Sequence, residues 1–121
     1  MRSLPDWPDD LDALRAAPEY HTLLFENASV RVLDTTVPSG ETVPLHTHCW
    51  PAVQYIVSWS DVVRRGADGG VVLDSRQIET KPGAGTTGWL EPLGPHTLEN
   101  VGDRELRVIS VELKGGPSPA S

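Results

Sequence analysis

The sequence predicts an all-β domain, a small antiparallel barrel or double sheet, preceded by one short helix. After residue 20, several short runs alternate apolar and polar residues, and glycine or proline marks the ends of these runs. Many short strands with little helix are typical of an antiparallel sandwich or small barrel. The length of 121 residues suits a single domain. We therefore expect an N-terminal helical segment (1–20), a barrel (21–114) and a disordered tail (115–121).

The first segment predicts one helix over residues 6–17. Asp6 can cap its N-terminus, and Pro8 suits its first turn. Pro18 cannot continue a helix and ends it. A helix of this length is not stable alone, so we expect it to dock on the barrel or on a partner chain.

The strands follow from the alternation of apolar residues and from the turn residues between them. The Asp68-Gly69 pair is a hairpin signal, and Leu106–Leu113 is the strongest of the runs. The predicted strands cover about residues 29–37, 52–59, 71–73, 76–81, 86–91 and 106–113.

Composition limits the classes of partner. The net charge of −7 argues against binding to nucleic acid or to an anionic membrane surface, because both depend on Lys and Arg. No apolar run approaches the roughly 18 residues that a membrane span needs. The single cysteine, Cys49, rules out an intramolecular disulfide framework, and the first residues lack the apolar core of a signal peptide. We expect a cytoplasmic protein.

Three of the four histidines lie in two segments that suit metal binding. His46 and His48 are two residues apart, so on a strand they point to the same face with Cα atoms roughly 6.6 Å apart. Two imidazoles at that spacing can share one ion at about 2.0–2.1 Å. His96 on a neighbouring strand would complete a cap with open positions for water or substrate. His21 is expected to be a surface or packing histidine.

These two segments resemble the two motifs of the cupin superfamily, and the resemblance covers about residues 25–114. It implies a double-sheet jelly roll, a metal site at His46, His48 and His96, and a homodimer, which is common among small cupins. The matching residues are Gly40, His46 and His48 in the first motif and Pro92, Gly94, His96 and Asn100 in the second.

The sequence departs from the family where the acidic ligand is usual, because Ala52 stands near that position. In this the chain looks like small bacterial cupins that are similar to a β-alanine degradation protein and also lack the glutamate. Gln54, on the same strand face, is the candidate fourth contact or holder of a bound water. Arg107, Trp50 and Trp89 are candidate pocket residues, and Arg107 either holds a substrate carboxylate or extends into solvent.

Three neutral imidazoles leave a divalent ion with its full charge, which suits Lewis-acid chemistry and an anionic substrate. The ion would be one divalent transition metal: iron, manganese, nickel, copper or zinc. The leading hypothesis is an enzyme, dioxygenase-like or isomerase-like, that acts on a small organic acid or dicarbonyl compound. The alternatives are a non-catalytic protein that binds or senses a small ligand, and a structural remnant without metal. No catalytic acid or base stands out in the sequence.

Overall fold

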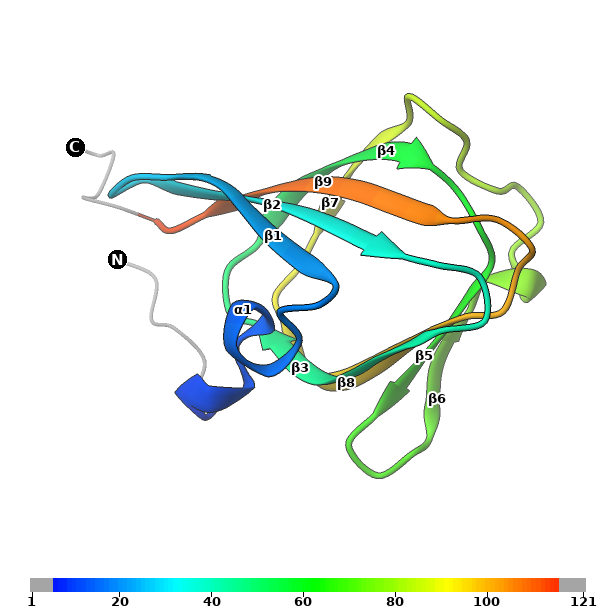
Figure 1. Cartoon of the computed structure of the whole chain (residues 1–121), viewed down its shortest axis with the longest axis horizontal. Helices are drawn as coiled ribbons and strands as arrows, with labels where there is room; N and C mark the ends of the chain where they lie inside the picture. Colours follow the sequence, from blue (N-terminus) through cyan, green and yellow to red (C-terminus); the bar gives the residue numbers. More distant parts are fainter. Residues whose placement is uncertain (1–5, 116–121) are drawn as a thin grey trace.

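The computed structural model describes residues 6–115, which form two antiparallel β-sheets that face each other (Figure 1). One sheet has the strand order β1-β2-β9-β4-β7, and the other has the order β3-β8-β5-β6. The all-β prediction with a short N-terminal helix is therefore confirmed. The strands are β1 (His21–Glu26), β2 (Val30–Val37), β3 (Thr42–His48), β4 (Ala52–Ser58), β5 (Val62–Gly66), β6 (Val71–Asp74), β7 (Thr87–Leu90), β8 (Leu93–Asn100) and β9 (Leu106–Leu113).

Most predicted strands are found near their expected bounds, and β9 has the bounds that were predicted. The Asp68-Gly69 turn does join β5 to β6, and Gly69 has the positive φ of 86° that glycine accepts without a steric penalty. The strand predicted over residues 76–81 is wrong. Ser75–Gln77 is a 3₁₀ turn instead, because the Asp74 carboxylate accepts a hydrogen bond from the Arg76 backbone N–H and bends the chain.

The predicted helix over residues 6–17 is two shorter pieces: a 3₁₀ turn, Asp9–Leu11, and an α-helix, α1, Ala13–Ala16. Asp12 separates them with an extended backbone, and its side chain, not that of Asp6, caps α1 by accepting from the Leu14 N–H at 3.1 Å. Helix α1 packs against β1 and β3 at one end of the barrel (Figure 1). Among the described residues, no helix is long and apolar enough to cross a membrane.

The apolar core lies between the two sheets and is closed at one end by the turn after β8. Asn100 is fully buried there, and its side-chain oxygen accepts hydrogen bonds from the Gly102 N–H at 3.0 Å and the Ser60 hydroxyl at 2.7 Å. The core residues are Ala17, Val37, Val43, Ile56, Val62, Leu106 and Val108.

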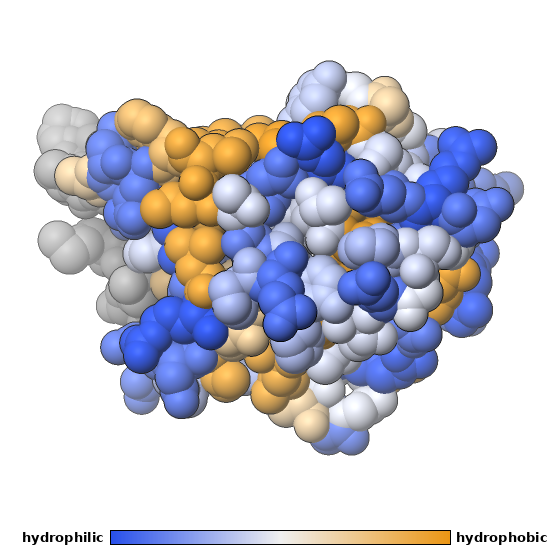
Figure 2. Space-filling view, in the orientation of Figure 1, coloured by the Kyte–Doolittle hydropathy of each residue, from blue (hydrophilic) through white to orange (hydrophobic). Residues whose placement is uncertain are grey.

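The outer face of the five-stranded sheet is also apolar. Strand register aligns one residue from each strand in a single row, and three of these side chains are 41–53% exposed. Figure 2 shows hydrophobic residues gathered along the upper edge of the molecule, where this sheet lies. We call this set the outer row; its members are Phe25, Val32, Val111, Val53 and Trp89.

Candidate metal centre

All four histidines of the chain meet inside the barrel. His46 and His48 come from β3, and His96 lies opposite His46 on β8 with ring centroids 4.3 Å apart. His21 reaches the same place from β1 in the other sheet, 4.9 Å from His46 and 5.4 Å from His48. His96 is farther from His48, at 5.9 Å, and each of the other three rings lies closest to His46.

The spacing of the ring nitrogens fits a metal ion. One nitrogen from each of His21, His46 and His48 lies within 4.8 Å of the other two. Two nitrogens that bind the same ion at about 2.1 Å lie at most about 4.2 Å apart. Small side-chain rotations would therefore bring these three nitrogens to bonding distance. This set of three includes His21, which we did not expect as a ligand from the sequence. His96 is not in the set, but its ring lies beside the ring of His46.

Each of the four imidazoles is fixed by an acceptor at its Nδ1 atom. A carbonyl or carboxylate oxygen cannot donate, so each Nδ1 must carry the hydrogen, and in a neutral ring Nε2 then keeps a free lone pair. This is the tautomer that binds metals through Nε2. The acceptors are Ala17 O for His21 (3.0 Å), Pro44 O for His46 (2.7 Å), Gly94 O for His96 (2.6 Å) and a Glu112 carboxylate oxygen for His48 (2.9 Å).

Burial keeps the rings of His21, His46 and His96 neutral. Burial, together with a smaller effect of the neighbouring imidazoles, lowers the pKa of His46 to about 2 and the pKa of His21 to about 4. The pKa of His96 falls to about 4, chiefly through burial and then through the charges of His48 and Arg64. Neutral imidazoles are the form that ligates metal, so three of the four rings are ready to bind at neutral pH.

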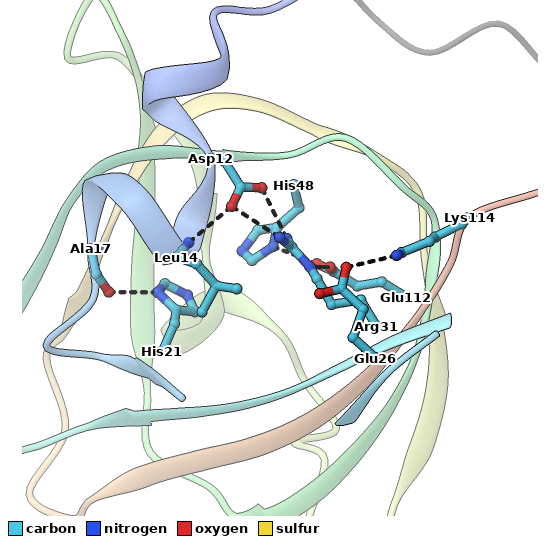
Figure 3. Close-up of polar contacts among 9 residues, drawn as sticks. All are labelled: Asp12, Leu14, Ala17, His21, Glu26, Arg31, His48, Glu112 and Lys114. Carbon is cyan, nitrogen blue, oxygen red and sulfur yellow. Dashed lines mark hydrogen bonds and ion pairs between the residues drawn. The ribbon is translucent and has the colours of Figure 1, made fainter. Parts of the chain in front are cut away.

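A buried ionic chain connects the N-terminal segment to His48 (Figure 3). Asp12 accepts two hydrogen bonds from the Arg31 guanidinium at 2.9 and 3.0 Å, and Arg31 Nε donates to Glu112 at 2.6 Å. The other carboxylate oxygen of Glu112 accepts from His48. Burial would raise the pKa of Glu112, but His48 and Arg31 together hold it below its usual value. Glu112 therefore remains ionised and orients His48.

The histidines line one side of a cavity of about 210 Å³. Trp50 and Gln54, both predicted candidates, line it, and Arg64 enters it from β5. Most of the remaining lining is apolar and comes from both sheets: Val43, Ala52, Trp59, Val62, Leu73, Leu90, Leu93, Leu98, Leu106 and Val108.

Two candidate pocket residues lie outside this cavity. Trp89 is 53% exposed on the outer row, where its indole N–H donates to Glu91. Arg107 is also on the outer face and pairs with Asp34 at 2.7 Å. Both faces of β9 carry apolar residues, so alternation alone did not reveal which face is internal. The internal face is the one that holds Leu106 and Glu112.

Sequence reasoning missed His21 and Glu112. His21 begins a strand that the pattern did not reveal, because β1 is an edge strand with an irregular register after Leu23 and largely exposed residues. Glu112 did carry a signal. It is a charged residue within the strongest predicted strand, two residues from Ser110 on the face opposite Arg107, and such a residue needs a buried partner.

No protein-family model and no curated protein matches the sequence. Solved structures do match the fold. A cupin domain from Bordetella pertussis Tohama I aligns with a TM-score of 0.62 and 19% identity, over 78% of this chain and 91% of that one. An RmlC-like cupin with a double-stranded β-helix fold from Methanocaldococcus jannaschii gives 0.55 and 13%, over 99% and 94%.

A protein with a double-stranded β-helix domain from Klebsiella pneumoniae gives a TM-score of 0.52 and 19% identity, over 84% of this chain and 78% of that one. Three structures from distant organisms thus share the arrangement of two facing sheets described above. The protein has the cupin fold, as the two histidine segments predicted. In this protein the histidines of both segments meet a fourth histidine inside the barrel.

Proposed function

We propose that the protein binds one divalent transition metal ion through His46, His48 and His96, with His21 as a fourth ligand. The observation that carries the proposal is the common state of the four rings. Each is held at Nδ1 by an acceptor, and each has Nε2 free beside the cavity. Imidazole ligands suit iron, nickel, copper and zinc, and manganese completes the set to be tested. This arrangement supports a metal site better than a structural remnant.

We further propose an enzyme that acts on a small organic acid or dicarbonyl compound, with dioxygenase-like or isomerase-like chemistry. A bound metal ion would supply Lewis-acid polarisation of a substrate oxygen. The chain would contribute the rest: Glu112 fixes the His48 ring, and the apolar walls exclude water. Gln54, which lines the same cavity as the histidines, would hold the substrate or a water by its amide.

One observation favours a second function, a protein that binds or senses a small ligand without turnover. Glu112 is the one carboxylate among the described residues that line the cavity, and both of its oxygens already accept hydrogen bonds. It is therefore not free to act as a general base. Saturable ligand binding with no turnover of carbonyl acids or thiols, and no oxygen uptake, would establish this second function.

The test of the metal site is elemental analysis of tag-free protein after growth with and without added iron, followed by titration of the metal found. We expect near-stoichiometric metal in the wild type and less than one tenth of it in His46→Ala and His96→Ala. His21→Ala should weaken affinity at least tenfold, and an unchanged affinity would reduce the site to three histidines. Full metal retention by folded His46→Ala or His96→Ala would refute the proposal.

We also propose that the protein is a homodimer that pairs through the outer row. The row crosses all five strands and contains no charged side chain. Contiguous exposed apolar surface of this kind marks an interaction site on a soluble protein. We expect a second copy of the chain to cover this row, because a two-fold contact buries the same apolar surface on both chains.

A further inference from the structure

The cavity contains a cation, Arg64, that finds no partner among residues 6–115. Arg64 projects from β5 into the space that the histidines line, and its Nε atom is buried without a hydrogen-bond acceptor. No carboxylate of the described residues lies within ion-pair distance of its guanidinium. Arg31, which is also buried, differs in this respect because both Asp12 and Glu112 pair with it.

The position of Arg64 follows from the strand register. It pairs with Leu98 on β8, two positions from His96 on the same internal face, and with Leu73 on β6. Its charge helps to lower the pKa of His96, after the larger effect of burial. Arg64 therefore shares the cavity with the metal-binding groups and lies on the His96 side.

An unpaired guanidinium is costly where it is partly buried in an apolar site, and the buried Nε of Arg64 has lost water and gained no acceptor. Burial lowers the pKa of Arg64, and no acidic side chain opposes that effect. Arginine nevertheless stays charged in proteins. Trp59 lines the same cavity, and its indole N–H is also buried without an acceptor among the described residues. The unsatisfied Arg64 donor in this cavity calls for a ligand that brings oxygen acceptors.

The geometry points to a small carboxylic acid as the ligand, with its carboxylate bound by Arg64 and its apolar remainder against the Trp and Leu walls. The planar guanidinium matches a carboxylate with two parallel hydrogen bonds. The cavity of about 210 Å³ is smaller than typical drug-sized sites, which begin at about 300 Å³, so the acid is short. The inference deepens the proposed function and rests on it for the metal end of the ligand.

Charge supports an acid over a neutral dicarbonyl compound. The chain Asp12–Arg31–Glu112 carries one net negative charge, and a divalent ion with Arg64 would carry three positive charges. An anionic ligand reduces that excess, whereas a neutral diketone leaves it. Arg64 thus takes one of the two roles that the sequence left open for Arg107, which pairs with Asp34 on the outer face.

The test compares 4-methylpentanoate with its uncharged amide by calorimetric titration of metal-loaded and metal-free protein. We expect the wild type to bind the carboxylate at least tenfold more tightly than the amide, and Arg64→Met to lose that preference. The matched control is Arg65→Met on the same strand. Arg65 faces outward and pairs with Glu99 at 2.8 Å, so its replacement should leave ligand affinity within twofold.

A stability measurement separates a ligand-binding role from a structural one. Because Arg64 has no internal partner, Arg64→Met should keep or raise the urea midpoint, whereas a structural arginine would lower it. Carboxylate binding that survives in Arg64→Met, or wild-type protein with no preference for the carboxylate, would overturn the inference. Metal content is recorded for each sample. Carboxylate selectivity in metal-free protein would uphold the Arg64 subsite even if the metal proposal failed.

Discussion

Replacing Glu112 with glutamine tests whether the buried ionic chain prepares the metal site. The carboxylate receives Arg31 Nε on one oxygen and His48 Nδ1 on the other, and the side chain is 1% exposed. Glutamine keeps the shape but offers one acceptor and one donor group. It can therefore accept from Arg31 or from His48, and the NH₂ group then faces the other donor without water to separate them.

The expected losses of stability and of metal affinity follow from the contacts that Glu112→Gln removes. A hydrogen bond to a charged group contributes about 1.5–3 kcal/mol to stability, so we expect the free energy of unfolding to fall by about that amount. Arg31 keeps its two bonds to Asp12, which limits the loss. Loss of the partner that orients a ligating histidine typically weakens metal affinity by about 10–100-fold, or about 1.4–2.7 kcal/mol.

The assay is competition with a chelator for the metal that the wild type binds, combined with urea unfolding of the metal-free protein. The matched control is Asp34→Asn, which makes the same change of charge at the ion pair with Arg107 on the outer face. This control should leave metal affinity within twofold. If folded Glu112→Gln binds metal as tightly as the wild type, the carboxylate does not orient His48 for ligation, and the reasoning is refuted.

Two further predictions concern pH and assembly. The folded pKa values of His21 and His96 are about 4 and that of His46 about 2, against an unfolded value of 6.5, so the unfolded chain binds more protons as pH falls below 6.5. Urea unfolding of metal-free protein should show stability decreasing from pH 6.5 toward 4, by up to about 1.4 kcal/mol per pH unit for each histidine; a constant stability would contradict this. Light scattering should show a dimer that Val53→Lys in the outer row dissociates and that Val72→Lys, on the other sheet, leaves intact; a dimer in both variants would exclude the outer row.

Much of the fold could be predicted because strand alternation and turn residues are local signals. Strand β9 was predicted with its observed bounds, and the Asp68-Gly69 hairpin was identified from two residues. The errors also have local causes. The 3₁₀ turn after Asp74 and the cap at Asp12 depend on single side-chain hydrogen bonds to the backbone, and these compete with the pattern of apolar residues.

The site was predicted only in part, because it combines residues from strands that are distant in sequence. His46, His48 and His96 could be related through a motif, whereas His21 lies in an edge strand that nothing in the pattern marked. Sequence reasoning left two places open for Arg107, and the structure has the one in solvent, where it pairs with Asp34. The outer row makes the external face of β9 as apolar as the internal one, so hydrophobicity could not distinguish them. A buried charge such as Glu112 is then the better guide to the internal face.

The N-terminal segment emerges as part of the site and not only as a cover for the barrel. Asp12 holds Arg31, which holds Glu112 and so His48, while the Ala17 carbonyl holds His21 from the other end of α1. The segment thus fixes rings on both sheets at once. Docking of α1 and ordering of the imidazoles are consequently coupled. Such coupling is reciprocal. If docking of the segment increases metal affinity by a given free energy, a metal ion that binds the ordered rings must stabilise the docked segment by the same free energy.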